Sequence, residues 1–219
     1  MLDNNTTTVA ELARTLTDAD RKQAERYVFW MDHGLLRTFW TNFAEVDTDV
    51  YRSNHPAHSR LESYRDMGIK SVLNLRGTPA KPHHILEVES CEKLGLELFS
   101  LALHARRPPR ADVLADLFEL FDRIPRPFVM HCKSGADRAG MASALYLLDQ
   151  GASVDEARKQ LSFRFLHIKR SKTGVQDHLL DLYEDRLKKG PISIRDWIST
   201  EYSPIELRDS FAKQWRFPI

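Results

Sequence analysis

Short apolar runs alternate with segments of helical periodicity along the middle of this chain. The runs at 69–75, 96–103 and 128–130 have the length and composition of buried strands. Between them, apolar residues recur at three- and four-residue spacing, as in helices with one apolar face. These helical segments are 61–67, 85–94 and 113–124. The alternation predicts an α/β fold with a central, mostly parallel sheet flanked by helices, which binds ligands at the carboxyl ends of its strands.

The segments on either side of this alternation are mainly helical. Residues 7–26 show one amphipathic helical pattern, and residues 177–189 show another that ends before Gly190. At 219 residues with 42% hydrophobic content, the chain can bury one sizeable core. We therefore predict one α/β domain with a helical extension at each end. The boundaries are 1–45, 46–190 and 191–219.

An aromatic segment at 26–43 lies within the first extension. Its large apolar residues recur at roughly helical spacing, which favours packing in the core. The alternative is an interfacial or partner-binding helix, which leaves contact with a membrane surface open. No apolar run approaches the ~20 residues needed to span a bilayer.

Composition narrows the classes of partner and compartment. The formal net charge is +1, which gives no global reason to expect nucleic acid or an anionic membrane as a partner. Two cysteines without an early secretory apolar run argue against a disulfide framework and predict a reducing, cytoplasmic setting. Cys91 lies in a helical stretch, where packing explains it.

The segment 131–140, with the sequence HCKSGADRAG, carries the most specific chemistry. It follows the apolar run at 128–130 and precedes a helical pattern at 139–148, so its backbone N–H groups lie at a helix N-terminus. Such a loop holds a tetrahedral anion, and its field favours the thiolate form of Cys132. Arg138 supplies a planar fork for two phosphate oxygens.

These residues resemble the His-Cys-x5-Arg motif of the cysteine-dependent tyrosine and dual-specificity phosphatases. The segments YRSNHP at 51–56 and GIKSVLNLR at 68–76 extend the resemblance to the small atypical dual-specificity branch, over about 46–150. It implies a phosphatase domain at 46–190 with Cys132 as nucleophile and Arg138 as phosphate clamp. No metal or cofactor is required by that scheme. The other loop residues would shape the loop and contact substrate; these are His131, Lys133, Ser134, Gly135 and Ala136.

The general acid is the main departure from the family pattern. In the family, the general acid is usually an aspartate in a loop after the strand that corresponds to 96–103. This chain has the sequence LHARR at 103–107, which contains no carboxylate. Asp112 fits better as a helix N-terminal residue. Asp137 is the provisional acid, as in myotubularin-like and Sac-like lipid phosphatases. The alternatives are His104, protonation by substrate or water, and a purely bracing salt bridge of Asp137.

A second departure is Ala139, where relatives commonly carry serine or threonine. That hydroxyl would assist departure of the cysteine thiolate, so the second reaction step is expected to be slow. Gln176 is either a water-positioning residue, as a glutamine is in related tyrosine phosphatases, or an ordinary surface amide. His167 and His178 are expected to be structural or exposed.

Basic residues near the expected strand ends bear on the substrate. Lys133 and Arg76 lie beside the loop, Arg106 and Arg107 follow a strand, and further cations lie at 169–172. They predict a phosphorylated protein or a more highly charged small molecule or lipid headgroup as substrate, although each can also be a solvated surface charge. Two alternatives to a phosphatase stay open, namely a rhodanese-like sulfur transferase and a non-catalytic phosphate-binding module.

Overall fold

The computed structural model describes residues 4–215 and divides into two compact units. The first, here called the sheet unit, contains residues 4–102 and 125–134. The second, the helical unit, contains residues 103–124 and 135–215. The chain passes from the sheet unit to the helical unit between Ser134 and Gly135, within the predicted phosphate-binding loop.

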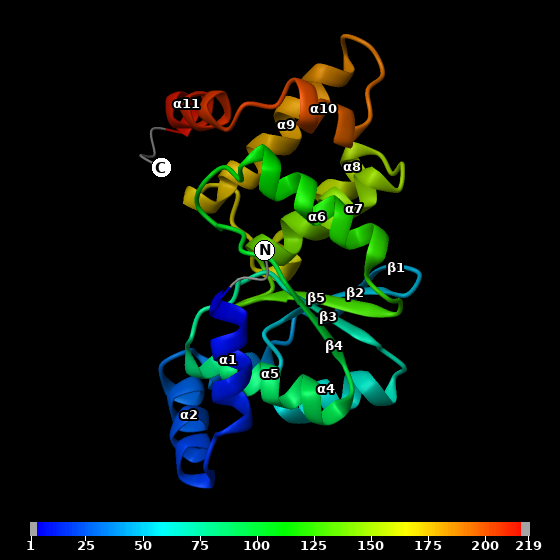
Figure 1. The fold of residues 1–219 in the computed structure, drawn as a ribbon. Coiled ribbons are helices and arrows are strands. Elements are labelled where there is room, and N and C mark those ends of the chain that lie inside the picture. Colours follow the sequence, from blue (N-terminus) through cyan, green and yellow to red (C-terminus); the bar gives the residue numbers. More distant parts are fainter. Residues whose placement is uncertain (1–3, 216–219) are drawn as a thin grey trace. The chain divides into compact units, whose positions relative to one another are not determined.

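A five-stranded sheet organises the sheet unit (Figure 1). The strands are β1 (Ala44–Asp47), β2 (Val50–Asn54), β3 (Ser71–Asn74), β4 (Glu97–Ser100) and β5 (Phe128–Cys132), in the order β1-β2-β5-β3-β4. Only the β1–β2 pair is antiparallel. The predicted α/β fold with a mostly parallel sheet flanked by helices is therefore confirmed. Strand β1 was not predicted, because its four residues at the sheet edge are mostly part-exposed and form no apolar run.

Helices α4 (His58–Asp66) and α5 (Pro82–Leu94) pack on this sheet. Leu61 of α4 and Cys91 of α5 share one buried apolar cluster with Val72 of β3 and Val129 of β5. Burying side chains of this kind stabilises the fold by about 1.5 to 3 kcal/mol each. Helix α5 ends at Leu94, and the C-cap residue Gly95 has a φ of 68°, a left-handed conformation that favours glycine.

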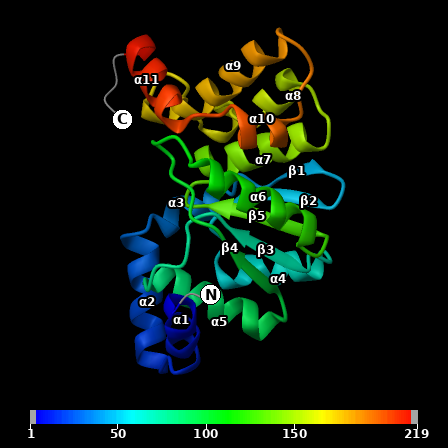
Figure 2. The same cartoon turned by 45° about the horizontal axis from the view of Figure 1, so that its top comes forward.

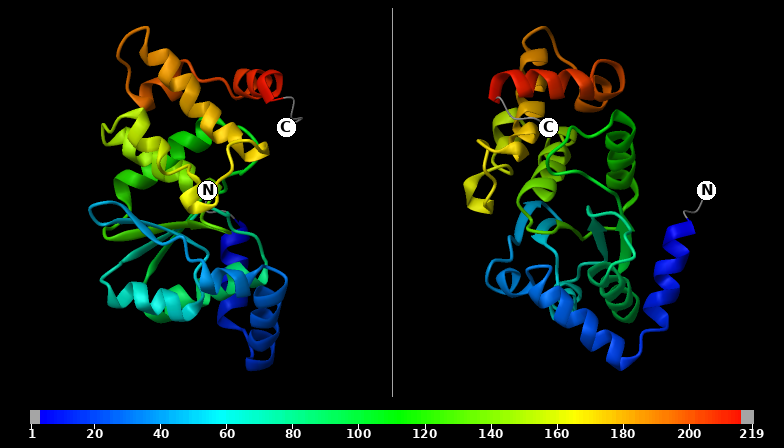
Figure 3. Two further views of the ribbon diagram at one scale, coloured as in Figure 1. Left: turned by 180° about the vertical axis from the view of Figure 1, so that it is seen from behind. Right: turned by 90° about the vertical axis from the view of Figure 1, so that its left-hand side faces the viewer.

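The N-terminal segment forms three helices, α1 (Asn4–Arg14), α2 (Asp18–Trp30) and α3 (Gly34–Phe39). Two of them, α1 and α2, replace the single helix predicted at 7–26. A capping box between Thr17 and Asp20 begins α2 and interrupts the pattern. Helices α1 and α2 both contact α5 (Figure 3), where Arg21 binds Glu89 at 2.5 Å.

The expectation that the aromatic segment at 26–43 packs in the core holds for Phe43, which contacts the buried cluster of the sheet unit, and is wrong for the large apolar residues before it. Trp30 is 67% exposed and Phe39 is 82% exposed. The reason is a break between α2 and α3, where His33 adopts a φ of 60°. The aromatic residues are thereby divided between two short helices and form no single buried stripe.

The helical unit contains six α-helices within residues 103–124 and 135–215 (Figure 2). They are α6 (Ala111–Arg123), α7 (Asp137–Asp149), α8 (Val154–Arg158), α9 (Val175–Leu187), α10 (Ile194–Thr200) and α11 (Pro204–Trp215), with short 3-10 turns at Phe163–Phe165 and Lys172–Gly174. Arg195 of α10 joins α6 and α7 by binding Asp122 at 2.7 Å and Asp149 at 2.5 Å. Ser153 caps α8, because its side chain accepts a hydrogen bond from the Glu156 backbone N–H.

None of the helices in the described part of the chain is both long and apolar enough to cross a membrane. The domain boundaries at 45 and 190 stay a prediction, and their outermost residues, 1–3 and 216–219, lie outside the described residues.

Candidate active site

Strand β5 leads directly into the residues predicted to bind phosphate. All five residues of β5 are buried, and the strand ends at Cys132. Gly135 has a φ of 74°, a left-handed backbone conformation that favours glycine. Helix α7 begins at Asp137. Segment 132–138 is thus a strand-to-helix loop that ends at a helix N-terminus, where N–H groups and the helix dipole favour an anion.

Hydrogen bonds hold the part of the loop that belongs to the sheet unit. The backbone N–H of His55 donates to the Lys133 carbonyl at 3.3 Å. The side-chain amide of Asn42 donates to the Ser134 carbonyl at 2.8 Å. Cys132 itself is 1% exposed at the end of β5. The sulfur therefore has a fixed position at the carboxyl end of a central strand.

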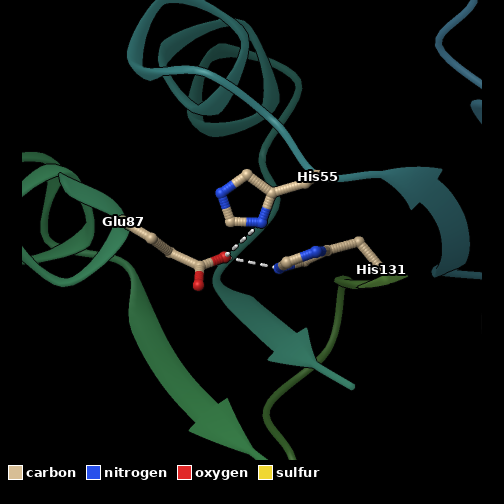
Figure 4. A group of neighbouring side chains, drawn as sticks. All are labelled: His55, Glu87 and His131. Atoms are coloured by element: carbon tan, nitrogen blue, oxygen red, sulfur yellow. Dashed lines mark ion pairs between the residues drawn. The ribbon is translucent and has the colours of Figure 1, made fainter. Parts of the chain in front are cut away.

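A buried carboxylate, Glu87 of α5, supports the residue that precedes Cys132 (Figure 4). Glu87 Oε1 lies 2.5 Å from His131 Nε2 and 3.8 Å from His55 Nδ1, and Oε2 lies 3.1 Å from His84 Nδ1. Burial alone would raise the pKa of Glu87, but His131 and His55 hold it well below its usual range. The other ring nitrogen of His131 lies 3.5 Å from the Cys132 carbonyl. An ionised Glu87 thus orients the ring beside the predicted nucleophile.

The same side chains form a set that could hold a metal ion. The donor atoms of His55, Glu87 and His131 all lie within 4.8 Å of one another. In a tetrahedral site with bonds of about 2.0 to 2.2 Å, neighbouring donor atoms are about 3.3 to 3.6 Å apart. His131 Nε2 and Glu87 Oε1 are closer than that, at 2.5 Å. Their spacing fits a direct ion pair, and we assign Glu87 the task of orienting His131.

Arg138 lies in the first turn of α7, in the helical unit. Its side chain is half-buried, and its Nε is buried without a hydrogen-bond partner among residues 4–215. A buried guanidinium N–H without a partner is unfavourable, and the planar fork matches the oxygens of a phosphate. The donor set of Arg138 therefore fits an oxyanion.

Asp137 belongs to a chain of three ionisable side chains within the helical unit. His167 Nδ1 lies 2.8 Å from Asp137 Oδ1, and His167 Nε2 lies 2.7 Å from Asp177 Oδ2. Burial alone would lower the pKa of His167, but the hydrogen bonds to the two carboxylates raise it to about 9. At neutral pH His167 is therefore an imidazolium that bridges Asp137 and Asp177. The expectation of a structural role for His167 did not foresee this contact with a candidate site residue.

The ion pairs of His167 predict a loss of stability in alkaline solution. A histidine whose pKa is higher in the folded state stabilises that state fully below its unfolded pKa of about 6.5. The contribution is lost as pH rises through about 9. We expect the urea concentration at the midpoint of unfolding to decrease as the pH rises from about 6.5 to about 9. His167→Gln should lower the midpoint at neutral pH and flatten this dependence, whereas His104→Gln, which alters an exposed ring, should keep the wild-type slope. Equal slopes in both variants would contradict the assignment.

The other candidates for the general acid lie elsewhere in the helical unit. Asp112 lies in the first turn of α6, as its sequence position predicts, and binds Arg110 at 2.5 Å. The Arg110 guanidinium lowers the pKa of this exposed carboxyl below its usual range. His104 is exposed in the segment before α6, together with Arg106 and Arg107.

Two of the predicted substrate-binding cations are already paired within the sheet unit. Arg76 forms two hydrogen bonds of 3.0 Å to Asp32, and Lys133 Nζ lies 3.3 Å from the same carboxylate. In the helical unit, Lys169 lies 3.4 Å from Asp181. These cations are therefore not the free surface charges that the sequence pattern allowed.

Gln176 is not an ordinary surface amide, which was one of its two predicted roles. It is 1% exposed in the first turn of α9, and its amide nitrogen donates to the Ala105 carbonyl at 3.2 Å. The correction follows from helix α9 beginning at Val175, which places Gln176 inside the helix rather than before it.

The ring of His178 is largely buried and contacts Ser210 Oγ at 2.8 Å, a structural role that was one of the two expected. Cys91 is 2% exposed in the apolar cluster, as predicted.

Sequence reasoning missed Glu87 and Asp32. Glu87 follows His84 by three residues, the spacing at which two side chains meet on a helix, so a local signal was present in the sequence. Asp32 has no comparable signal, since its partners Arg37, Arg76 and Lys133 come from three separate segments. Only the tertiary fold brings that group together.

The fold has counterparts among solved phosphatase structures. TpbA of P. aeruginosa superposes with a TM-score of 0.51 at 20% identity, covering 78% of this chain and 91% of TpbA. Tk-PTP in its active form superposes with a TM-score of 0.51 at 23% identity, covering 67% of this chain and 99% of Tk-PTP. The chain therefore shares the fold of these two proteins.

The family model described as "DSP-PTPase phosphatase fused to NAD+ Kinase" matches residues 41–177. The chain belongs to this family. This confirms the resemblance to the dual-specificity phosphatases that the loop sequence indicated.

Curated relatives include plant enzymes. Inositol diphosphatase DSP1 of Oryza sativa is 31% identical over 104 residues, which is 45% of this chain and 46% of DSP1. Inositol diphosphatase DSP5 of Arabidopsis thaliana is 30% identical over 107 residues, which is 45% of this chain and 50% of DSP5. The chain thus spans about half the length of these relatives.

Proposed function

We propose that this chain hydrolyses phosphomonoesters by cysteine-dependent catalysis. The observation that carries the proposal is the loop at 132–138, which begins at buried Cys132 and ends at Arg138 with an unpartnered, buried Nε. Membership of a phosphatase family supports it. A rhodanese-like reaction lacks this support.

The proposed reaction has two steps. The Cys132 thiolate attacks phosphorus and forms a sulfur–phosphorus bond, while the bond from phosphorus to the leaving oxygen breaks. Water then attacks the phosphocysteine, releases inorganic phosphate and restores the thiolate. Arg138 and the loop N–H groups hold the phosphate oxygens through both transition states. Glu87 has a positioning role: it fixes the ring of His131, the residue before Cys132.

Rapid acid quenching tests this proposal. A substrate with a labelled phosphate should leave label on Cys132 within the first turnover. Because Ala139 offers no hydroxyl to assist the second step, we expect a burst of released alcohol followed by slower steady turnover. The Cys91→Ser variant should show the same burst, because Cys91 lies in the apolar cluster of the sheet unit. An unlabelled enzyme that still turns over would contradict the proposal.

A second candidate function is hydrolysis of a polyphosphorylated small molecule with a good leaving group. Two of the relatives are named inositol diphosphatases. The segment 103–111 contains no carboxylate, and His167 holds Asp137 as an ion pair. If Asp137 braces the loop and donates no proton, the loss matters little when the leaving group is itself a phosphate. The ion pair between His167 and Asp137 supports the alternative in which Asp137 braces the loop.

The Asp137→Asn variant separates these roles of Asp137. If Asp137 braces the loop, turnover should fall by similar factors of under about 10-fold on an alkyl phosphate and on an aryl phosphate with a good leaving group. Loss of a general acid would instead lower alkyl phosphate turnover by about 10² to 10⁴-fold and spare the aryl phosphate. Steady-state rates on the two substrates provide the measurement. The Asp181→Asn variant, which alters a carboxylate on α9 outside this ion-paired chain, provides the control.

The proposal extends to partners and compartment. The substrates are phosphorylated molecules, either phosphoproteins or small polyanions, and nucleic acid is not among them. A membrane-surface substrate stays a hypothesis that vesicles containing a phosphorylated headgroup can test. A cytoplasmic, reducing setting suits the proposed reaction, because oxidation of Cys132 would remove the nucleophile.

A further inference from the structure

Asp32, between α2 and α3, gathers three cations around one carboxylate. Its Oδ2 lies 2.7 Å from Arg37 Nη1 and 3.0 Å from Arg76 Nη1. Its Oδ1 lies 3.0 Å from Arg76 Nη2 and 3.3 Å from Lys133 Nζ. All four residues belong to the sheet unit. The cluster carries a net charge of +2, because three cations meet one anion.

The contacts to Asp32 have the geometry with which proteins hold phosphate. Arg76 presents both terminal nitrogens to both carboxylate oxygens, the two-bond arrangement that arginine also forms with phosphate. The side chains of Asp32, Arg37 and Arg76 are each only 8 to 9% exposed. Burial alone would raise the pKa of Asp32, but Arg76 and Arg37 hold it well below its usual range. An anion is therefore strongly favoured at this position.

The cluster is attached to the strands that carry the catalytic loop. Lys133 directly follows Cys132. The residue before Arg76, Leu75, donates its backbone N–H to the His131 carbonyl at 2.9 Å. The backbone N–H of Arg76 donates to Asn74 Oδ1 at 2.8 Å, which fixes the chain at this point. The cations thus stand beside the carboxyl end of β5.

We propose that Arg37, Arg76 and Lys133 form a second anion subsite next to the phosphate-binding loop, and that the carboxylate of Asp32 fills it. The ligand class is a second phosphate group on the same substrate. Asp32 is then a specificity-determining residue that disfavours polyphosphorylated substrates relative to monophosphates. This role of Asp32 rests on the proposed phosphatase function of the loop. Asp32 would select between the two candidate substrate classes, monophosphates and polyphosphorylated molecules.

Ligand titration tests the subsite without requiring turnover. Cys132→Ser protein would be titrated calorimetrically with myo-inositol hexakisphosphate and with inorganic phosphate, with and without Asp32→Asn. We expect Asp32→Asn to tighten binding of the hexakisphosphate at least about 10-fold and to change phosphate binding by less than about 3-fold. The matched control is Asp18→Asn, which removes the same charge from a 92% exposed side chain that also pairs with an arginine, Arg21.

The result that overturns the proposal is an Asp32→Asn protein whose preference for the hexakisphosphate over phosphate equals that of the Asp18→Asn protein. If Asp32→Asn does not fold, the charge-preserving double variant Asp32→Asn with Arg37→Met replaces it. This variant leaves Arg76 and Lys133 to bind the ligand, so the same gain is expected and the same equality overturns the subsite. Lack of hydrolysis by the wild-type protein would count against the proposed function, while this titration still decides the subsite.

Discussion

Replacing Cys132 with serine is expected to lower the rate of phosphate release on the order of 10⁴-fold or more, as loss of a catalytic nucleophile does in other enzymes. A serine hydroxyl is a much weaker nucleophile than a thiolate unless an adjacent base removes its proton. The measurement is initial-rate hydrolysis of an aryl phosphate under reducing conditions.

Binding should survive this change, because serine preserves the size of the side chain and the loop N–H groups are unaltered. The control is Cys91→Ser, which alters the other cysteine within the same unit. Burial raises the pKa of Cys91, so this sulfur stays a protonated thiol in the apolar cluster. Retention of wild-type turnover by Cys132→Ser would remove the sulfur from the reaction.

Replacing Arg138 with lysine is expected to lower turnover by about 10² to 10³-fold although the positive charge is kept. Lysine is a point charge and cannot present two parallel N–H groups to the phosphate oxygens. The loss should appear mainly in kcat, because charge spreads over those oxygens most strongly in the transition state.

Arg208→Lys is the matched control for this second prediction. It makes the same exchange in α11 of the helical unit, where Arg208 pairs with the neighbouring Asp209. Its turnover should equal that of the wild type. If Arg138→Lys also keeps wild-type turnover, the phosphate is not held by the guanidinium fork.

Local sequence rules were sufficient for the elements that position the loop. The buried strand before Cys132 and the helix α5 that carries Glu87 both follow from apolar runs and helical periodicity within a few residues. The edge strand β1 and the break at Thr17 were missed. Strand β1 has only four residues, and the break at Thr17 rests on a polar capping box, so neither appears in the pattern of apolar residues.

The site was predictable where its residues are neighbours in sequence and unpredictable where they are not. Cys132 and Arg138 lie on one loop, so their spacing alone indicated phosphate chemistry. The partner of Asp137 is His167, thirty residues away, and the partner of His131 is Glu87, on a helix in another part of the chain. Such pairs form only when helices and strands pack, because no spacing rule connects them.

Glu87 and His167 have opposite acid–base consequences for the two ends of the loop. In the sheet unit, Glu87 stabilises the folded state only above the usual carboxyl range, and burial lowers the pKa of His55, so both groups penalise folding in acid. In the helical unit, His167 loses its proton as pH rises through about 9. Acid therefore undermines the strand that carries the sulfur, and alkali undermines the helix that carries the guanidinium. If the activity of this protein has a bell-shaped dependence on pH, the loss at low pH reflects unfolding of the sheet unit and the loss at high pH reflects unfolding of the helical unit. Neither loss then requires the titration of a group that reacts with the substrate.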